Sequence, residues 1–394
     1  MISLTVRLLE NNTAARLTIR HGVIQSILPL EMSSVERDLL PWAAPGLFDL
    51  QLNGFQGIWF SSESLTVDDV ESVITAFARQ GITGCLPTLI TNSSEAIEHG
   101  LHTIFLATQR SNLVREMIRG CHVEGPWISP ENGPRGAHPI AHVRHADRTE
   151  LQRWQKAAGG LVRLITLAPE VPGTLDLIPD AVRQGITIAI GHTAASGTTI
   201  TTAIERGATL GTHLGNGCAG MLPRHDNIFW PQLADDRLNV SVIADGWHVP
   251  APMLKCILRC KTPDRLILTS DISGFGGCPP GRYMTPAVDV EVLPDGRIVV
   301  AGQTQYLAGS GATTGECVVR FHQTCDVPLQ LAWDMASLHP TRLLGLPTAS
   351  IEEGQPAFLT IFRTELDESA DAPDGRRFVP ESAFIRGIHV DAAT

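Results

Sequence analysis

The sequence lacks several features that would place it in large classes of protein. It has 30 Lys and Arg against 41 Asp and Glu, a formal net charge of −11, and its basic residues are scattered. Nucleic-acid binding needs a concentrated basic surface, so that class is excluded. No apolar run approaches the roughly 18 residues of a membrane-spanning helix. The opening MISLTVRLLENNTAARLTIR also alternates apolar and polar residues, unlike a signal peptide. We therefore expect a cytoplasmic protein that binds neither nucleic acid nor membrane.

A disulfide framework is also absent from the sequence pattern. The eight cysteines are spread over 394 residues in apolar settings, which predicts reduced thiols. Cys256 and Cys260 form a C-x3-C pair with no second pair of ligands nearby, which favours structural thiols over a metal site. With 43% hydrophobic and 18% charged residues, the chain is instead typical of a folded globular protein.

Short apolar runs separated by helical patterns fill the centre of the sequence. Such repeated strand-helix units predict a parallel sheet, and eight of them predict a closed, TIM-like (β/α)8 barrel of the α/β class. The stretch TVDDVESVITAFARQG (66–81) begins with acidic residues and ends at Gly, as helix termini favour. The eight runs are PGLFDLQL (45–52), GITGCLPTLI (81–90), IRGCHVE (118–124), LVRLITLAPE (161–170), GITIAIGH (185–192), GATLGTHLGN (207–216), LNVSVIADGWH (238–248) and DRLILTSD (264–271).

The two ends of the sequence have a different pattern. Residues 1–44 alternate apolar and polar side chains between turn signals, and residues 351–394 are again strand-like and rich in turns. We expect 1–44 and 351–394 to form one small β-sandwich domain, with 45–350 as the metallo-hydrolase barrel. A Pro-Asp-Gly turn between two alternating runs predicts a hairpin insertion near 286–306, on the top side of the barrel.

Ionisable residues at the ends of five of these runs are our candidates for an active site. The carboxyl ends of the strands meet at the mouth of such a barrel, where active sites lie. Singly, each residue is better explained as a hydrogen-bonded loop residue or a helix cap. Together, two histidines, a glutamate and an aspartate predict a hydrolytic zinc site, with three protein ligands, a position for water and a spare carboxylate to move its proton. The residues are Glu124, His192, His213, Asp245 with His248, and Asp271.

Several motifs resemble those of the N-acetylglucosamine-6-phosphate deacetylases of the amidohydrolase superfamily. They extend over most of the chain, and HVEGPW and IADGWHV are quite specific. The resemblance implies a metal-dependent hydrolase that removes the acetyl group from N-acetylglucosamine 6-phosphate, giving glucosamine 6-phosphate and acetate. The other motifs are PGLFDLQLNGFQG, LAPE, IGHTAA, THLGNG, TSD followed by LAGS, and the late EEGQPAFLTIF.

The resemblance also implies roles for individual residues. It implies one divalent metal ion, expected to be Zn²⁺, held by Glu124, His192 and His213. It implies Asp271 as the general acid and base and His138 as the histidine that polarises the substrate carbonyl. It implies a homodimer, in which an arginine binds the phosphate at the neighbouring subunit's site. The substrate-binding residues that it implies are His248, Asn216, Gly217 and Arg224.

Parts of the sequence depart from the family's pattern. Many amidohydrolases end the first barrel strand with His-x-His and bind two metals, whereas this chain has Gln51-Leu52-Asn53. Amide side chains are poor zinc ligands, so we expect one metal and favour hydrogen bonding across the barrel mouth for Gln51 and Asn53. The loops 215–230 and 272–280 also differ, and loops of this kind face the substrate.

Two alternatives to this function stay open at this point. The protein could be an amidohydrolase that acts on another N-acyl sugar or N-acyl compound, since Trp230 and Trp247 either stack on a sugar ring or pack against the protein. It could also be a catalytically silent barrel that serves as a scaffold or sensor. The complete set of predicted ligands speaks against the silent barrel.

Overall fold

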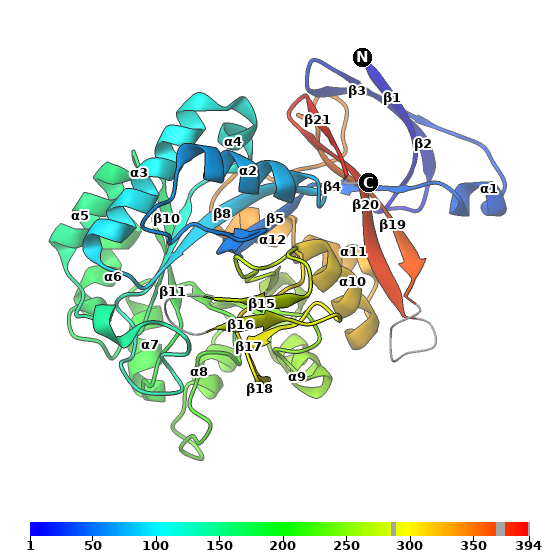
Figure 1. The fold of residues 1–394 in the computed structure, drawn as a ribbon. Helices are drawn as coiled ribbons and strands as arrows, with labels where there is room; N and C mark the ends of the chain where they lie inside the picture. The colour runs from blue at the N-terminus through cyan, green and yellow to red at the C-terminus, as the bar shows by residue number, and fades with distance from the viewer. Residues whose placement is uncertain (285–288, 368–374, 393–394) are drawn as a thin grey trace.

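The computed structural model describes residues 1–284, 289–367 and 375–392 (Figure 1). Its centre is a barrel of eight parallel strands, and each of the eight apolar runs contributes one strand, in order. The first and last strands meet through a single bridge between Leu52 and Ile272, so the predicted barrel is confirmed and nearly closed. The strands are β5 (Leu47–Leu52), β8 (Ile82–Ile90), β9 (Cys121–Glu124), β10 (Val162–Leu167), β11 (Thr187–Ile190), β12 (Leu210–Gly211), β13 (Asn239–Ile243) and β14 (Leu266–Thr269).

Helices cover the outside of the barrel. The helix expected within 66–81 is α2 (Val67–Ala78), which begins with a capping box in which Thr66 and Asp69 each accept a hydrogen bond from the other's backbone N–H. None of the described helices is long and apolar enough to cross a membrane. The others around the barrel are α3 (Ser94–Arg110), α4 (Asn112–Met117), α5 (Arg148–Ala157), α6 (Thr174–Arg183), α7 (Gly197–Glu205), α8 (Phe229–Ala234), α9 (Ala251–Lys261), α10 (Thr314–Cys325), α11 (Leu329–Asp334) and α12 (Leu338–Leu343).

The inside of the barrel is layered from apolar to polar. A buried cluster near the amino ends of the strands includes Leu86, Leu164 and Leu210. Side chains two positions further along a strand point to the same face, and there the same three segments carry threonines. Inside the barrel the apolar layer therefore lies below a polar layer of threonines, which faces the mouth. The buried threonines are Thr88, Thr166 and Thr212.

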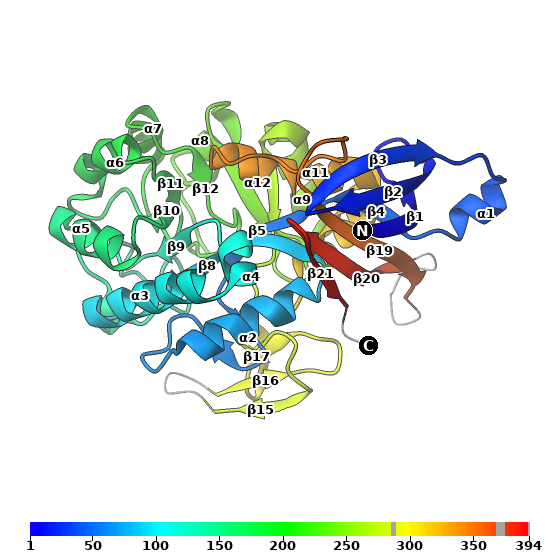
Figure 2. The ribbon, with the colours of Figure 1, turned by 90° about the horizontal axis from the view of Figure 1, so that it is seen from above.

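Strands from both ends of the chain form a separate sheet beside the barrel (Figure 2). It confirms the small β domain built from both termini and is one mixed seven-stranded sheet, in the order β21-β20-β19-β4-β1-β2-β3. The domain boundaries at residues 44 and 351 stay predictions. The strands are β1 (Ile2–Leu8), β2 (Ala14–Arg20), β3 (Val23–Pro29), β4 (Trp42–Pro45), β19 (Phe358–Leu366), β20 (Arg376–Ile385) and β21 (Ile388–Asp391), with α1 (Ser34–Asp38) between β3 and β4.

A small antiparallel sheet follows β14 along the chain (Figure 2). Its strands β16 (Val290–Val292) and β17 (Ile298–Val300) form a hairpin inside the segment where one was expected. Residues 286–288 of that expected hairpin lie outside the described residues. The flanking strands are β15 (Gly281–Tyr283) and β18 (Gln303–Leu307), and a further hairpin, β6 (Gly54–Phe55) with β7 (Ile58–Trp59), follows β5.

Candidate metal centre and active site

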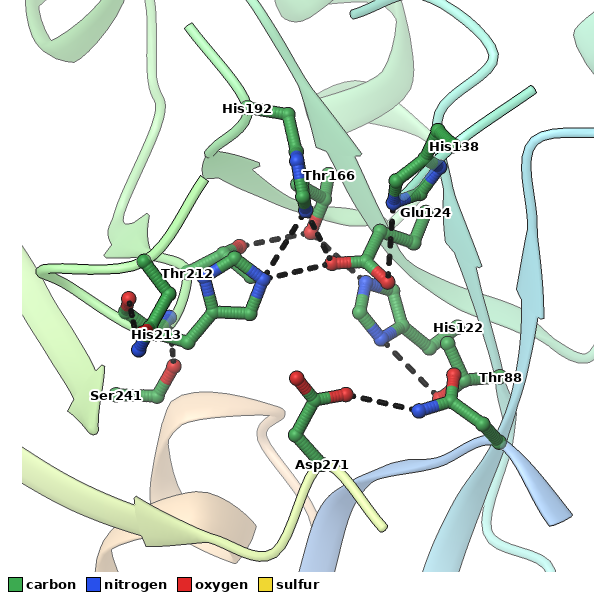
Figure 3. Close-up of polar contacts among 12 residues, drawn as sticks. Thr88, His122, Glu124, His138, Thr166, His192, Thr212, His213, Ser241 and Asp271 are labelled. Atoms are coloured by element: carbon green, nitrogen blue, oxygen red, sulfur yellow. Dashed lines mark hydrogen bonds and ion pairs between the residues drawn. The ribbon is translucent and has the colours of Figure 1, made fainter. Parts of the chain in front are cut away.

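Glu124, His192 and His213 come together at the mouth of the barrel (Figure 3). Glu124 ends β9, and the two histidines follow β11 and β12, so strands on one side of the barrel supply all three. Oε1 of Glu124 lies 3.2 Å from Nε2 of His192 and 3.0 Å from Nε2 of His213, and the two ring nitrogens are 3.2 Å apart. The side chains are only 3–8% exposed. Three atoms of the kinds that bind divalent ions therefore face one point.

A hydrogen bond at the outer nitrogen of His192 leaves its inner nitrogen suited to a metal, whereas Nδ1 of His213 has no partner among the described residues. Nδ1 of His192 lies 2.9 Å from the carbonyl oxygen of Pro134, so it carries a hydrogen and its Nε2 can be bare. Burial raises the pKa of Glu124, but when the rings of His192 and His213 are protonated their hydrogen bonds outweigh burial and hold it well below its usual range. A carboxylate oxygen and two ring nitrogens this close would repel each other through their lone pairs unless a proton or cation lay between them. The donor set therefore fits a divalent cation.

The backbone at this site is held in an uncommon conformation. His192, His213 and Asp271 have φ angles of 50°, 29° and 48°, in the left-handed region that residues other than glycine rarely adopt. At or beside each of these residues, a backbone N–H donates to a polar side chain of an adjacent strand or its loop. The side chains are thereby aimed before any ligand binds. The three bonds run from Ala194 to Glu170, from His213 to Ser241, and from Ser270 to Asp49.

Asp271 follows β14 and points toward the cluster across the mouth (Figure 3). Nδ2 of Asn53 donates to its Oδ1 at 2.8 Å, which confirms the hydrogen bond expected across the barrel mouth. Gln51 makes no such bond, because its Nε2 is buried without a partner among the described residues. Burial, and then the charge of Glu124, raise the pKa of Asp271 from 3.8 to about 6. A carboxyl with this pKa can both accept and donate a proton near neutral pH.

His138 reaches the cluster from the long loop after β9. Its Nε2 lies 3.9 Å from Oε2 of Glu124, and its Nδ1 lies 2.8 Å from Oγ1 of Thr91. The backbone N–H of Thr91 also points at Nδ1, at 3.4 Å, which favours the tautomer with its hydrogen on Nε2. Burial, and then the charge of His192, lower the pKa of His138 to about 3, so the ring is neutral at neutral pH. His138 can therefore present an N–H donor to a bound ligand.

Two of the predicted substrate contacts lie directly beside the cluster. Nδ2 of Asn216 donates to the carbonyl oxygen of His213 at 3.3 Å. Gly217 has a φ of 55°, and a Cβ there would lie 2.7 Å from Nδ1 of His192, so a larger residue would displace that ring. This segment follows the metal ligand closely and forms part of the mouth.

The other two predicted contacts differ in how they are held. Nδ1 of His248 lies 2.6 Å from Oδ2 of Asp245, and Oδ1 of the same carboxylate accepts the backbone N–H of His248 at 2.9 Å. The side chain of Arg224 is exposed, and in the described part of the chain no hydrogen bond or ion pair joins it to the cluster. In the structure, His248 is therefore held by the carboxylate of Asp245, whereas the exposed side chain of Arg224 can bind a ligand or a second chain.

Two residues that hydrogen-bond to the loops of the site, Glu170 and Thr91, were not predicted from the sequence. Glu170 accepts hydrogen bonds from Oγ1 of Thr193 at 2.5 Å and from the N–H of Ala194 at 2.6 Å, directly after His192. It ends the fourth apolar run, so the rule applied to the other runs would have selected it. Thr91, the partner of His138, carries no comparable signal, because a lone threonine after a strand is common.

The fold and the cluster together define the class: a (β/α)8 barrel hydrolase with a possible divalent metal site at its mouth. The model of the Amidohydrolase family matches residues 42–387, and the chain belongs to this family. It is a deacetylase-like amidohydrolase, a hydrolase that acts on an amide bond. The family expected from the motifs is therefore confirmed.

Two named relatives and one solved structure are similar to most of the chain. The chain is 36% identical over 317 residues to N-acetylglucosamine-6-phosphate deacetylase of Bos taurus, covering 77% of this chain and 74% of that protein. It is 31% identical over 332 residues to N-acetylgalactosamine-6-phosphate deacetylase of Escherichia coli O157:H7, covering 84% and 85%. A solved structure of the Mycobacterium smegmatis N-acetyl-D-glucosamine-6-phosphate deacetylase, an aspartate-to-alanine variant in complex with N-acetyl-D-glucosamine-6-phosphate, matches with a TM-score of 0.84 and 29% identity over 99% of both chains.

Proposed function

We propose that this protein removes the acetyl group from N-acetylglucosamine 6-phosphate and releases glucosamine 6-phosphate and acetate. The observation that carries the proposal is the buried cluster of Glu124, His192 and His213, which faces the carboxyl group of Asp271 across the barrel mouth. Relatives that cover most of the chain and bear the name of this activity support the choice of substrate.

Glu124, His192 and His213 would hold one divalent ion. One carboxylate and two imidazoles suit Zn²⁺, and the amides of Gln51 and Asn53 offer poor ligands for a second ion. When bound, such an ion polarises a carbonyl oxygen and lowers the pKa of a coordinated water toward about 7. The tautomer of His192, set by Pro134, keeps its Nε2 available to the ion.

Asp271 and His138 would carry out the proton transfer and charge stabilisation. Asp271 takes a proton from the attacking water and gives it to the sugar nitrogen as the C–N bond breaks, a task that suits a carboxyl with a pKa of about 6. His138 donates from Nε2 to the acetyl oxygen as that oxygen gains negative charge. His138 is buried and Asp271 is half-buried, which limits the contact of these hydrogen bonds with bulk water.

The sugar phosphate would be bound by residues around the mouth. His248, Asn216 and the backbone of Gly217 contact the sugar, and Arg224 binds the phosphate, for which the planar guanidinium is suited. The exposed side chain of Arg224, unpaired in the described structure, supports its action at the site of a second subunit in a homodimer. The dimer is part of the proposal.

The experiment compares kcat/KM for acetate release by the metal-loaded enzyme on three substrates. These are N-acetylglucosamine 6-phosphate, N-acetylgalactosamine 6-phosphate and unphosphorylated N-acetylglucosamine. We expect the first to exceed the third by about 100-fold, which is about 2.7 kcal/mol of transition-state binding. A clear preference for the galactosamine substrate would move the assignment to the other named relative. Loss of turnover on all three with metal bound would overturn the proposal in favour of another N-acyl compound or a silent barrel.

A further inference from the structure

A second buried carboxylate, Asp49, lies inside strand β5 below the mouth. It is 0% exposed, and a carboxylate in such a place is unfavourable unless hydrogen bonds replace the water that it loses. In the described part of the chain its hydrogen-bond partners are hydroxyl groups and backbone N–H groups, with no lysine or arginine among them. Asp49 therefore has no ion-pair role and needs another explanation.

Five donors from three parts of the chain converge on this carboxylate. Oδ1 accepts from the N–H of Gln51 at 3.0 Å, from Oγ1 of Thr269 at 2.6 Å and from the N–H of Ser270 at 3.3 Å. Oδ2 accepts from Oγ1 of Thr314 at 2.6 Å and from the hydroxyl of Ser270. The side chain of Asp49 thus joins β5, the end of β14 and the start of α10 at one point.

These bonds lie at the seam where the barrel closes. Among the described strands, β14 and β5 share no continuous ladder. The backbone contacts here are the bridge between Leu52 and Ile272 and a hydrogen bond from the N–H of Asn53 to the carbonyl oxygen of Ile272 at 3.2 Å. Because a ladder is missing, the carboxylate of Asp49 supplies much of the connection between the two strands.

Asp49 is connected to Asp271 through both β5 and β14. Ser270, held through its N–H and its hydroxyl, directly precedes Asp271 with its left-handed φ of 48°. On the other strand, Gln51 is two residues before Asn53, whose side chain donates to Asp271. We propose that Asp49 is a positioning residue for Asp271: it fixes the turn that aims the Asp271 carboxylate and the strand that carries its partner Asn53. This inference rests on the proposed function, in which Asp271 moves the proton.

The first test is Asp49→Asn, which keeps the size of the side chain but turns an amide NH₂ toward hydroxyl and N–H donors. We expect kcat on N-acetylglucosamine 6-phosphate to fall by about 30-fold, because misplacement of a reacting group by a fraction of an ångström lowers the rate by such factors. KM and bound metal should stay within about twofold, because the ligands lie on other strands. The matched control is Thr360→Val, which removes another buried hydroxyl bonded to Leu47 on the same strand and to Gly81. It should lower Tm and leave kcat unchanged.

A double-mutant comparison separates positioning from general destabilisation. If Asp49 acts through Asp271, Asp49→Asn should not lower the residual rate of the Asp271→Asn enzyme any further. An equal loss in both backgrounds would overturn the inference, as would an unchanged kcat in Asp49→Asn alone. Full turnover by Asp271→Asn would instead contradict the proposed function. Because that result comes from the single Asp271→Asn variant, it can be told apart from a failure of the inference about Asp49.

A milder pair of variants covers the case in which Asp49→Asn does not fold. Thr269→Val and Thr314→Val each remove one donor and leave the carboxylate with its other partners. We expect each to lower kcat by about threefold with KM unchanged, because the carboxylate keeps most of its hydrogen bonds. Values of kcat equal to that of Thr360→Val would overturn the inference.

Discussion

The barrel mouth has two parts that are built in different ways, which we call its rigid side and its loop side. On the rigid side, Glu124, His192 and His213 lie at or just after strand ends, are only 3–8% exposed and contact one another. The loop side follows His213 along the chain, over residues 215–230, and there Arg224 is exposed and Trp230, in α8, is 54% exposed. The groups suited to the reaction are therefore fixed by the barrel, whereas the groups suited to substrate recognition lie on a connection at the surface.

This difference explains how relatives can share chemistry and differ in substrate. Buried polar groups that complete each other's hydrogen bonds tolerate little change, because a lost partner leaves the other group unsatisfied. Loop residues at the surface lack this constraint. The relatives from Bos taurus and Escherichia coli O157:H7 are both deacetylases of amino sugar phosphates by name, and their names differ in the sugar alone. We expect the rigid side of the mouth to set the reaction and the loop side to set the sugar.

The largest effect should come from the rigid side of the mouth. Glu124→Gln removes the charged ligand and places an amide between two ring nitrogens, so we expect loss of bound metal and a fall in kcat/KM of about 10,000-fold, because a metal supplies several kcal/mol of transition-state stabilisation. Metal content by elemental analysis and acetate release measure the two effects. Glu131→Gln, at an exposed glutamate of the loop after β9, is the control and should change neither. A metal-loaded and active Glu124→Gln enzyme would place the metal elsewhere.

Asp271→Asn should separate proton transfer from metal binding. An amide cannot carry the proton from water to the leaving amine, so we expect kcat to fall by about 1,000-fold while the metal stays bound. The pair to measure is kcat on N-acetylglucosamine 6-phosphate and the metal-to-protein ratio. Retained turnover would remove Asp271 from the acid and base role, and loss of the metal would show instead that it is a ligand.

The sequence predicted the rigid side of the mouth well, for a physical reason. Glu124, His192 and His213 end apolar runs, and the geometry of a parallel barrel brings such ends together, so local pattern and topology suffice to place them. Asp49 carries the same kind of signal, a carboxylate inside the buried run PGLFDLQL, yet it escaped notice because it is not at a strand end. Its role depends on donors 220 or more residues away in the sequence, which no local pattern contains.

The loop side could not be predicted in the same way. The place of Asn216 and Gly217 beside His213 and His192 depends on backbone turns with positive φ, and no apolar period fixes the path of such a loop. Hydrogen bonding across the mouth was expected for both Gln51 and Asn53 without a named partner; Asn53 makes such a bond, to Asp271, whereas Nε2 of Gln51 has no partner among the described residues. The ends of apolar runs were thus predictable from the sequence pattern, whereas the loop residues Asn216 and Gly217 were named through the family resemblance alone.

The metal-free protein offers a test of the rigid side that does not depend on turnover. Burial raises the pKa of Asp271 from 3.8 to about 6, so the folded state favours the protonated form. This carboxyl therefore contributes most to stability below its unfolded pKa, and the contribution is lost as pH rises through about 6. We expect metal-free Asp271→Asn to be about 2 kcal/mol more stable than the parent chain at pH 8, with the difference vanishing below about pH 4.

Urea unfolding in the presence of a chelator, from about pH 4 to pH 8, measures this difference. Asp236→Asn, at an exposed aspartate, is the control and should change stability by less than about 0.5 kcal/mol at every pH. A constant gain for Asp271→Asn across the whole pH range would mean that the amide packs better. It would not support a carboxyl that is held at a raised pKa by its surroundings.

The smallest effect is expected on the loop side of the mouth. Arg224→Ala should raise KM for N-acetylglucosamine 6-phosphate by about 10-fold and leave unphosphorylated N-acetylglucosamine unaffected, because one charge-assisted contact to phosphate is lost. Arg16→Ala, at an exposed arginine of the terminal sheet, should change neither value. Equal changes on both substrates would remove Arg224 from phosphate binding.

Mixing two defective chains then tests whether Arg224 acts across a dimer interface. When Arg224→Ala and Asp271→Asn chains are co-expressed and mixed dimers are purified with two affinity tags, the first chain keeps its own Asp271 and receives Arg224 from the second. One of the two sites is then intact, so kcat/KM at low substrate should recover to about half of the parent value, because the other site is inactive. If Arg224 instead serves its own subunit, every mixed dimer contains two defective sites, and activity stays at the level expected from the separate chains.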